Sequence, residues 1–187
     1  MNEPPREDDA PGGSLTAAAI VCYAVLLAAG AFWLWWRDRL GLVPEFAGGR
    51  HGVWMSAAAG AGVGLSLAGA CALGARAVPA LRDLERRLAG LIGPLTPRQA
   101  GIVALASGLG EEFLFRCAMQ DALGWVWASL CFALAHAGPA RLWLWPLLAG
   151  SVGLLFAAMV EWGLGLCSVT VAHALLNYLQ LRRIAPA

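Results

Sequence analysis

Three charged residues stand close together in an otherwise apolar stretch of the chain. Residues 111–116 read Glu-Glu-Phe-Leu-Phe-Arg and follow the uncharged run GIVALASGLG. A charged side chain at the centre of a lipid bilayer costs about 2.5–3.5 kcal/mol on insertion scales. If this stretch crosses a membrane, its charges therefore require either partners or a chemical function.

Helical spacing divides these charges into an ion pair and a single carboxylate. Glu112 and Arg116 are four residues apart, so they lie on one face of a helix and can form a bidentate pair. Glu111 is rotated by about 100° around the same helix and has no cation on it. A buried carboxylate without a cation is the usual state of a general base or acid. The spacing therefore predicts that chemistry for Glu111; a purely structural clamp of Glu112 and Arg116 is the alternative.

Two further apolar stretches each carry a histidine. They read Phe-Ala-Leu-Ala-His, which ends at His136, and His-Ala-Leu-Leu-Asn, which runs from His173 to Asn177. His173 and Asn177 are one helical turn apart and can both donate hydrogen bonds into one cavity, as an oxyanion hole requires. His136 precedes the break at Gly138-Pro139, and irregular backbone at membrane depth is tolerated only against protein or a wet cavity. We therefore expect water to enter at this break.

In this order and in successive apolar segments, the three patterns resemble the signature motifs of the CPBP family. That family contains the type II CAAX prenyl endopeptidases and bacteriocin-processing or immunity-associated membrane proteins. The resemblance covers about residues 95–183 and implies an intramembrane glutamate-type protease. The chain is expected to have fewer spans than the prenyl endopeptidases, so the resemblance implies the chemistry but not a prenylated substrate.

The resemblance also implies a role for each motif residue. Glu111 is then the general base, and His136 helps to hold and activate the water. The other roles follow by motif position: stabilisation of the oxyanion by His173 and Asn177, and orientation of the site by Glu112 and Arg116.

The composition places these motifs in a membrane protein. Of the 187 residues, 59% are hydrophobic and 13% are charged, whereas a soluble domain is about half apolar and about a quarter charged. We expect an all-α, polytopic transmembrane bundle of about six spans with a catalytic cavity in the membrane. A disordered polar tail is expected at 1–13, and one transmembrane domain at 14–183. The spans are expected at about 14–36, 52–75, 99–120, 122–137, 142–160 and 163–181.

The arginines predict how the bundle is oriented. With the N-terminus inside, nine arginines fall on the cytoplasmic side and three on the other, and cytoplasmic loops are those enriched in Arg. This predicts a multi-pass protein of the cell membrane, of a bacterial inner membrane in particular, with both termini cytoplasmic. Within the second expected span, Gly60 and Gly64 form a GxxxG pattern, which lets helices approach closely.

The expected partners are membrane lipid and a peptide or protein substrate in or at the membrane. A net charge of +1 gives no support for nucleic-acid binding. No cofactor or metal is expected, although two histidines and a glutamate would also suit a catalytic zinc ion. A haem protein with two axial histidines, a non-catalytic adaptor or immunity protein, and a transporter with a proton relay remain alternatives. Ser107, one turn before Glu111, is interpreted as a packing residue and not as a nucleophile.

Overall fold

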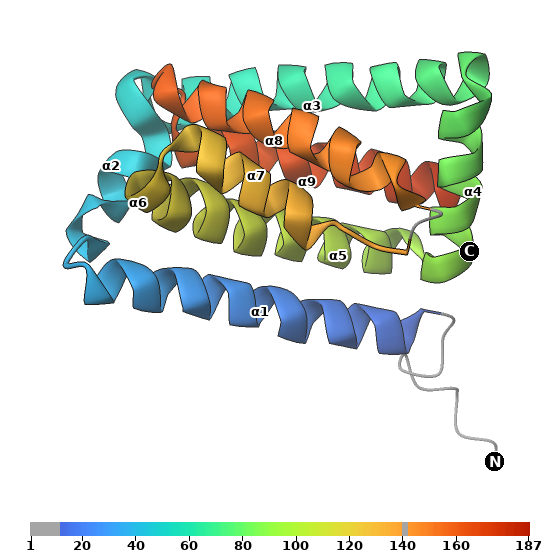
Figure 1. Cartoon of the computed structure of the whole chain (residues 1–187), viewed down its shortest axis with the longest axis horizontal. Helices are drawn as coiled ribbons and strands as arrows, with labels where there is room; N and C mark the ends of the chain where they lie inside the picture. Colours follow the sequence, from blue (N-terminus) through green and yellow to red (C-terminus); the bar gives the residue numbers. More distant parts are fainter. Residues whose placement is uncertain (1–11, 140–141) are drawn as a thin grey trace.

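The protein is a bundle of helical rods that alternate in direction. The computed structural model describes residues 12–139 and 142–187, and within them the only strand-like pairing is an isolated bridge between Leu95 and Pro186. Figure 1 shows the rods lying side by side. They are α1 (Gly13–Trp36), α3 (Gly52–Ala77), α5 (Pro97–Glu112), α7 (Trp125–Ala135), α8 (Leu144–Glu161) and α9 (Gly165–Ile184). The predicted all-α bundle is therefore confirmed.

Shorter elements connect these rods. The turn from α1 to α3 contains η2 (Leu40–Leu42), α2 (Val43–Gly48) and η3 (Gly49–His51), whereas α4 (Pro79–Ile92) joins α3 to α5. The third rod does not end with α5, because it continues through a π-helical segment, η4 (Phe113–Met119), and through α6 (Gln120–Leu123). The charged motif therefore lies in the middle of one long rod.

Local sequence explains where this third rod begins and ends. Thr96 accepts a hydrogen bond from the Gln99 backbone N–H, the Gln99 side chain accepts one from the Thr96 backbone, and Pro97 occupies the first turn. This reciprocal capping satisfies N–H groups that have no partner within the helix. At the other end, Gly124 has a φ of 83°, a conformation that other residues adopt only with strain.

Among the described residues, three helical stretches are long and apolar enough to cross a membrane: Gly13–Trp36, Phe46–Ala77 and Leu144–Glu161. The segments that carry the candidate site residues do not reach this standard. Their polar residues lower the hydropathy of α5 and α9, and α7 has 11 residues, about 16 Å of helix, against a hydrocarbon core of about 30 Å. The protein is a membrane protein, and the count of six spans stays a prediction.

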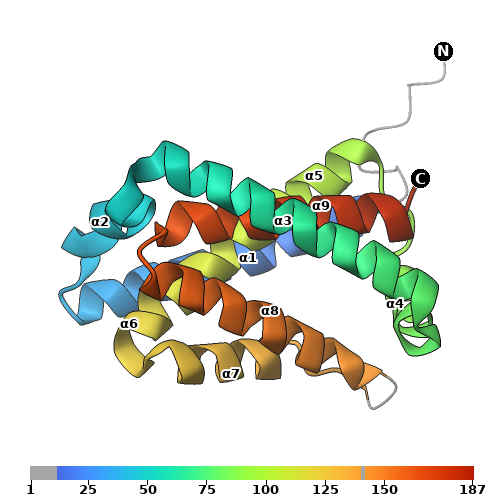
Figure 2. The ribbon, with the colours of Figure 1, turned by 90° about the horizontal axis from the view of Figure 1, so that it is seen from above.

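Both described ends of the chain lie at the same end of the bundle (Figure 1). In the view of Figure 2, α4 lies beside that end, where α3 turns back towards α5. The connection between α3 and α5 thus contains a 14-residue helix. Arg6, Arg141 and most of the expected tail at 1–13 lie outside the described residues.

Large aromatic side chains mark the opposite end of the bundle. Trp36 ends α1 and Trp54 lies in the first turn of α3, and they are 77% and 88% exposed. Trp125 begins α7, and Trp162 follows α8 directly. Indole rings prefer the boundary between lipid and water, so this arrangement fits a membrane interface at this end of the bundle.

The GxxxG pattern joins α3 to α9. A Cβ atom at Gly64 would lie 2.7 Å from the backbone oxygen of Ala172, and one at Gly60 would overlap the backbone of Ser168. The predicted role of Gly60 and Gly64 in close helix packing is therefore confirmed. Gly62 lies between them on the same helix, and a Cβ there would meet nothing within 4 Å.

We expect Gly60→Ala and Gly64→Ala each to lower the thermal midpoint and the folded yield in detergent. Overpacking a close contact costs about 1–3 kcal/mol, which outweighs the gain of up to about 1 kcal/mol in helix propensity. Gly62→Ala is the matched control and should leave both quantities unchanged or slightly higher. Equal effects of all three substitutions would contradict close α3–α9 packing.

Candidate active site

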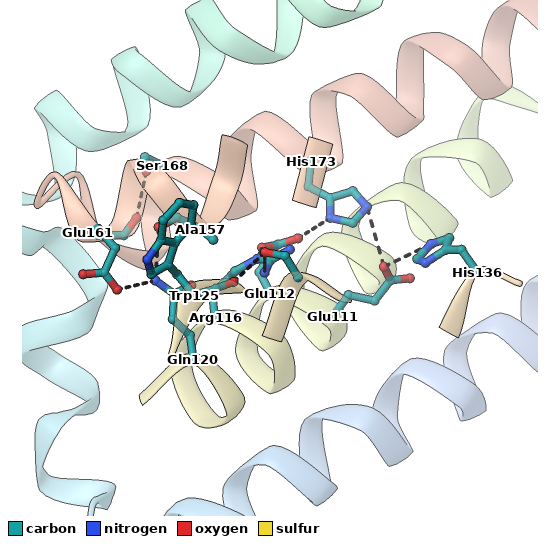
Figure 3. Close-up of polar contacts among 12 residues, drawn as sticks. Glu111, Glu112, Arg116, Gln120, Trp125, His136, Ala157, Glu161, Ser168 and His173 are labelled. Carbon is teal, nitrogen blue, oxygen red and sulfur yellow. Dashed lines mark hydrogen bonds and ion pairs between the residues drawn. The ribbon is translucent and has the colours of Figure 1, made fainter. Parts of the chain in front are cut away.

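The structure brings five of the six predicted site residues into direct contact or near contact (Figure 3). They come from three separate rods: α5 with η4, the end of α7, and the middle of α9. The five residues are Glu111, Glu112, Arg116, His136 and His173.

Glu112 is the centre of a buried ionic cluster. One carboxylate oxygen, Oε1, accepts a hydrogen bond of 2.6 Å from Nδ1 of His173, and the other accepts one of 3.1 Å from Nε of Arg116. The side chains of Glu112 and Arg116 are both 0% exposed. The ion pair predicted from their spacing is therefore confirmed, but it has one hydrogen bond and is not bidentate. The contact of His173 with Glu112 had not been expected.

Neighbouring side chains hold the Arg116 guanidinium from two other directions. Its Nη1 donates a hydrogen bond of 3.3 Å to Ser129 of α7, and the group lies 5.0 Å from the centre of the Phe132 ring. Attraction between a guanidinium and an aromatic face adds to such packing. The backbone changes to π-helix directly after Glu112, a geometry that is rare and often found at functional sites.

Glu111 faces both histidines without bonding to either. Its Oε2 lies 3.7 Å from Nε2 of His136 and 3.9 Å from Nε2 of His173, which is longer than a hydrogen bond. This buried oxygen has no hydrogen-bond partner among the described residues. Tyr23 of α1 is a further polar neighbour, and its hydroxyl interacts with the Glu111 carboxyl. The sequence did not single out Tyr23, because nothing in α1 shows that it packs beside Glu111.

A backbone contact assigns the tautomer of His136. Its Nδ1 lies 2.8 Å from the carbonyl oxygen of Phe132. A carbonyl only accepts hydrogen bonds, so Nδ1 carries the proton and a neutral His136 has an unprotonated Nε2. The atoms of Glu111, His136 and His173 that converge here are therefore suited to binding a polar molecule between them.

Asn177 is the sixth predicted residue, and its partner is Ser107. The Asn177 Nδ2 donates a hydrogen bond of 2.9 Å to Ser107 Oγ, which in turn donates one of 3.0 Å to the carbonyl oxygen of Ala104. Close packing permits this contact, because a Cβ at Gly108 would lie only 3.1 Å from backbone atoms of α9. Ser107 is buried, as a packing residue would be, but it also holds a candidate catalytic side chain.

Two polar residues at the α6 end of the rod form separate contacts. Gln120 Nε2 donates to the carbonyl oxygen of Ala157 at 3.1 Å and to Glu161 Oε1 at 2.9 Å. Asp121 accepts hydrogen bonds from Arg37 and from both Nε and Nη2 of Arg39. Hydrogen bonding from Arg39 holds the pKa of Asp121 below its ordinary value. These contacts tie the α1–α2 turn to the rod that carries the site.

Comparison with known proteins agrees with the motifs. Residues 94–179 match the family model for type II CAAX prenyl endopeptidase Rce1-like proteins, and this stretch includes all six predicted site residues. No curated protein and no solved structure matches the chain. The resemblance inferred from the three motifs is thus confirmed: residues 94–179 are similar to the type II CAAX prenyl endopeptidase Rce1-like proteins, which are CAAX-type membrane proteases.

Proposed function

We propose that the protein is an intramembrane endopeptidase that hydrolyses a peptide bond of a membrane-associated substrate with water activated by Glu111. The observation that carries this proposal is the buried Oε2 of Glu111, which faces the Nε2 atoms of His136 and His173 at 3.7 and 3.9 Å. Polar atoms that are too far apart to bond directly are commonly bridged by water. A water bound there would lie against a carboxylate and an unprotonated imidazole nitrogen.

The proposed proton transfers use Glu111, and His136 holds the water. Glu111 removes one proton from the water as the water oxygen attacks the substrate carbonyl carbon. The second O–H of the water donates a hydrogen bond to His136 Nε2 and keeps its proton. Glu111 then returns its proton to the nitrogen of the leaving amine as the C–N bond breaks. Such general acid–base help contributes about 10²–10⁴-fold to a rate.

Charge balance supports a protonated His173. Glu112 and Glu111 are two buried carboxylates, whereas Arg116 is the one permanent cation of the cluster. Burying net charge is costly, and a doubly protonated His173 would make the four groups neutral together. His173 would then donate from Nδ1 to Glu112 and from Nε2 to the developing oxyanion, which Asn177 would stabilise as a second donor. Glu112 and Arg116 act by positioning His173.

The experiment compares membranes from cells that carry the native chain with membranes from cells that carry Glu111→Ala. Newly formed peptide termini are labelled and identified by mass spectrometry. We expect a set of membrane peptides that is cleaved only with the native chain, which would reveal the activity and the substrate together. Identical peptide sets would contradict the proposed activity and favour a non-catalytic adaptor.

Inhibitors then test the proposed chemistry on a synthetic copy of one such peptide. Among the described residues, no group of three or more His, Cys, Asp or Glu side chains is arranged to hold a metal ion. We expect cleavage to persist with EDTA, with phenanthroline and with reagents that modify serine or thiol groups. Loss of activity with a chelator and recovery with zinc would instead make Glu111, His136 and His173 metal ligands.

We also propose that the protein crosses the cell membrane, as in a bacterial inner membrane, with both termini in the cytoplasm. Support comes from the arginines of α4 and of the last turn of α9, which lie at the bundle end that also holds the described termini. A fluorescent reporter fused after Arg183 should be active in the cytoplasm, and a phosphatase that needs the periplasm should be inactive there. The reverse pattern would invert the topology.

A further inference from the structure

We propose that Ser107 is a positioning residue that fixes which way the amide of Asn177 faces. This inference rests on the proposed function, in which Asn177 donates to the oxyanion. Ser107 Oγ is the partner of Asn177 Nδ2 at 2.9 Å, across the contact between α5 and α9. The two residues are 70 positions apart in the sequence.

The bonding of Ser107 restricts it to one role towards Asn177. A hydroxyl has a single hydrogen, and Ser107 donates that hydrogen to the carbonyl oxygen of Ala104 at 3.0 Å. Its oxygen can therefore only accept from Asn177, so the NH₂ group of the amide must face Ser107 and the amide oxygen must not. The serine thus distinguishes two amide orientations that have nearly the same shape.

The orientation matters because an amide is a donor at one end and an acceptor at the other. Nδ2 carries two hydrogens; Ser107 takes one, and the second stays available to an oxyanion. If the amide turned over, its oxygen would replace Nδ2, and an acceptor would face the developing negative charge. Without the Ser107 hydroxyl, the side-chain contact that opposes this flip is lost.

The arrangement of α5 and α9 links this pair to the rest of the site. Ser107 lies one turn before Glu111 on α5, and Asn177 lies one turn after His173 on α9. The helices are antiparallel (Figure 1). The Ser107–Asn177 contact therefore lies one helical turn along from the contact of the glutamates with His173. The serine therefore acts on the candidate oxyanion donor from within the helix that carries the base.

Ser168 offers a matched control for removing this hydroxyl. Like Ser107, it is a buried helical serine that donates to the carbonyl oxygen three residues earlier, in its case to Gly165 at 2.8 Å. Among the side-chain hydrogen bonds of the described residues, Ser168 has none to a site residue. Ser107→Ala and Ser168→Ala thus remove equivalent local bonds, and only the first reaches Asn177.

The test measures kcat and KM per folded enzyme on the synthetic peptide whose cleavage depends on Glu111. A neutral hydrogen bond is worth roughly 3- to 10-fold, so Ser107→Ala should lower kcat by about that factor with KM unchanged. Ser168→Ala should keep the native kcat. In an Asn177→Ala background, Ser107→Ala should cause no further loss, because the side chain that it orients is absent.

Each result discriminates between the two proposals. If Ser107→Ala lowers kcat equally with and without Asn177, or if Ser168→Ala causes the same loss, Ser107 has only a structural role and this inference is wrong. If Asn177→Ala alone keeps full activity, the oxyanion assignment fails first, and the role of Ser107 fails with it. An unchanged kcat in Ser107→Ala, with Asn177→Ala strongly impaired, would overturn this inference alone.

Discussion

Glu111→Gln should leave the protein folded and lower its peptidase rate by at least about 100-fold, the lower bound for general-base help. Glutamine keeps the shape of glutamate and can still hydrogen-bond, but it cannot take a proton from water. The Glu111 Oε2 atom has no hydrogen-bond partner among the described residues, so the substitution breaks no hydrogen bond of that oxygen. The measurement is kcat on the synthetic peptide, with the thermal midpoint as the check on folding.

Glu161→Gln is the control for this prediction. Glu161 is also a carboxylate of the bundle, but it bonds to Gln120 at the α6 end of the rod, so its loss should not change kcat. His173→Ala and Asn177→Ala should each lower the rate by about 10²–10³-fold if both donate to the oxyanion. A Glu111→Gln enzyme with more than a tenth of the native kcat would rule out Glu111 as the general base.

Arg116→Ala should destabilise the fold as well as remove activity. Breaking a buried ion pair from one side costs about 3–5 kcal/mol, because the remaining charge is left uncompensated. Here the remaining charge is Glu112, whose side chain is completely buried and would keep only His173 as a partner. We expect a lower thermal midpoint in detergent and a much lower folded yield in membranes.

The double substitution Glu112→Gln with Arg116→Met should be milder for folding, because it removes both charges together. Arg86→Ala controls for the loss of an arginine, since Arg86 is 72% exposed and lies 3.5 Å from Asp83; it should not change the yield. Activity should be lost in both Arg116 variants if the pair positions His173. Equal yields of the single and double variants would mean that the pair contributes little to stability.

The sequence by itself determined the features that depend on short spacings. Glu112 and Arg116 are four residues apart, and any helix places them together. Gly60 and Gly64 likewise leave part of one helix face without side chains, and the backbone of α9 packs against it. Composition was sufficient for the membrane class and the all-α fold, because a lipid environment leaves few other ways to satisfy the backbone.

The sequence also separated the two glutamates, but it could not identify what Glu111 faces. Its neighbours His136 and His173 lie at the end of α7 and in α9, and His173, which also bonds to Glu112, is 61 positions from that glutamate. In membrane helices that are apolar on every side, periodicity does not reveal which face meets which neighbour. Close contacts between small residues decide that packing, as at Gly108, where α5 approaches the backbone of α9.

Only the tertiary structure decided the role that can be assigned to Ser107. In the sequence it is a small residue among Ala, Gly and Leu, and the motif interpretation treated it as packing. Its contact with Asn177 depends on the antiparallel packing of α5 against α9 and on the depth at which each helix lies. Hydropathy also could not predict the length of α7. The apolar pattern does not mark the two ends of this helix, which lie at Gly124 and after Ala135. Spacing along one helix is fixed by backbone geometry, whereas contacts between helices depend on the packing of the whole bundle.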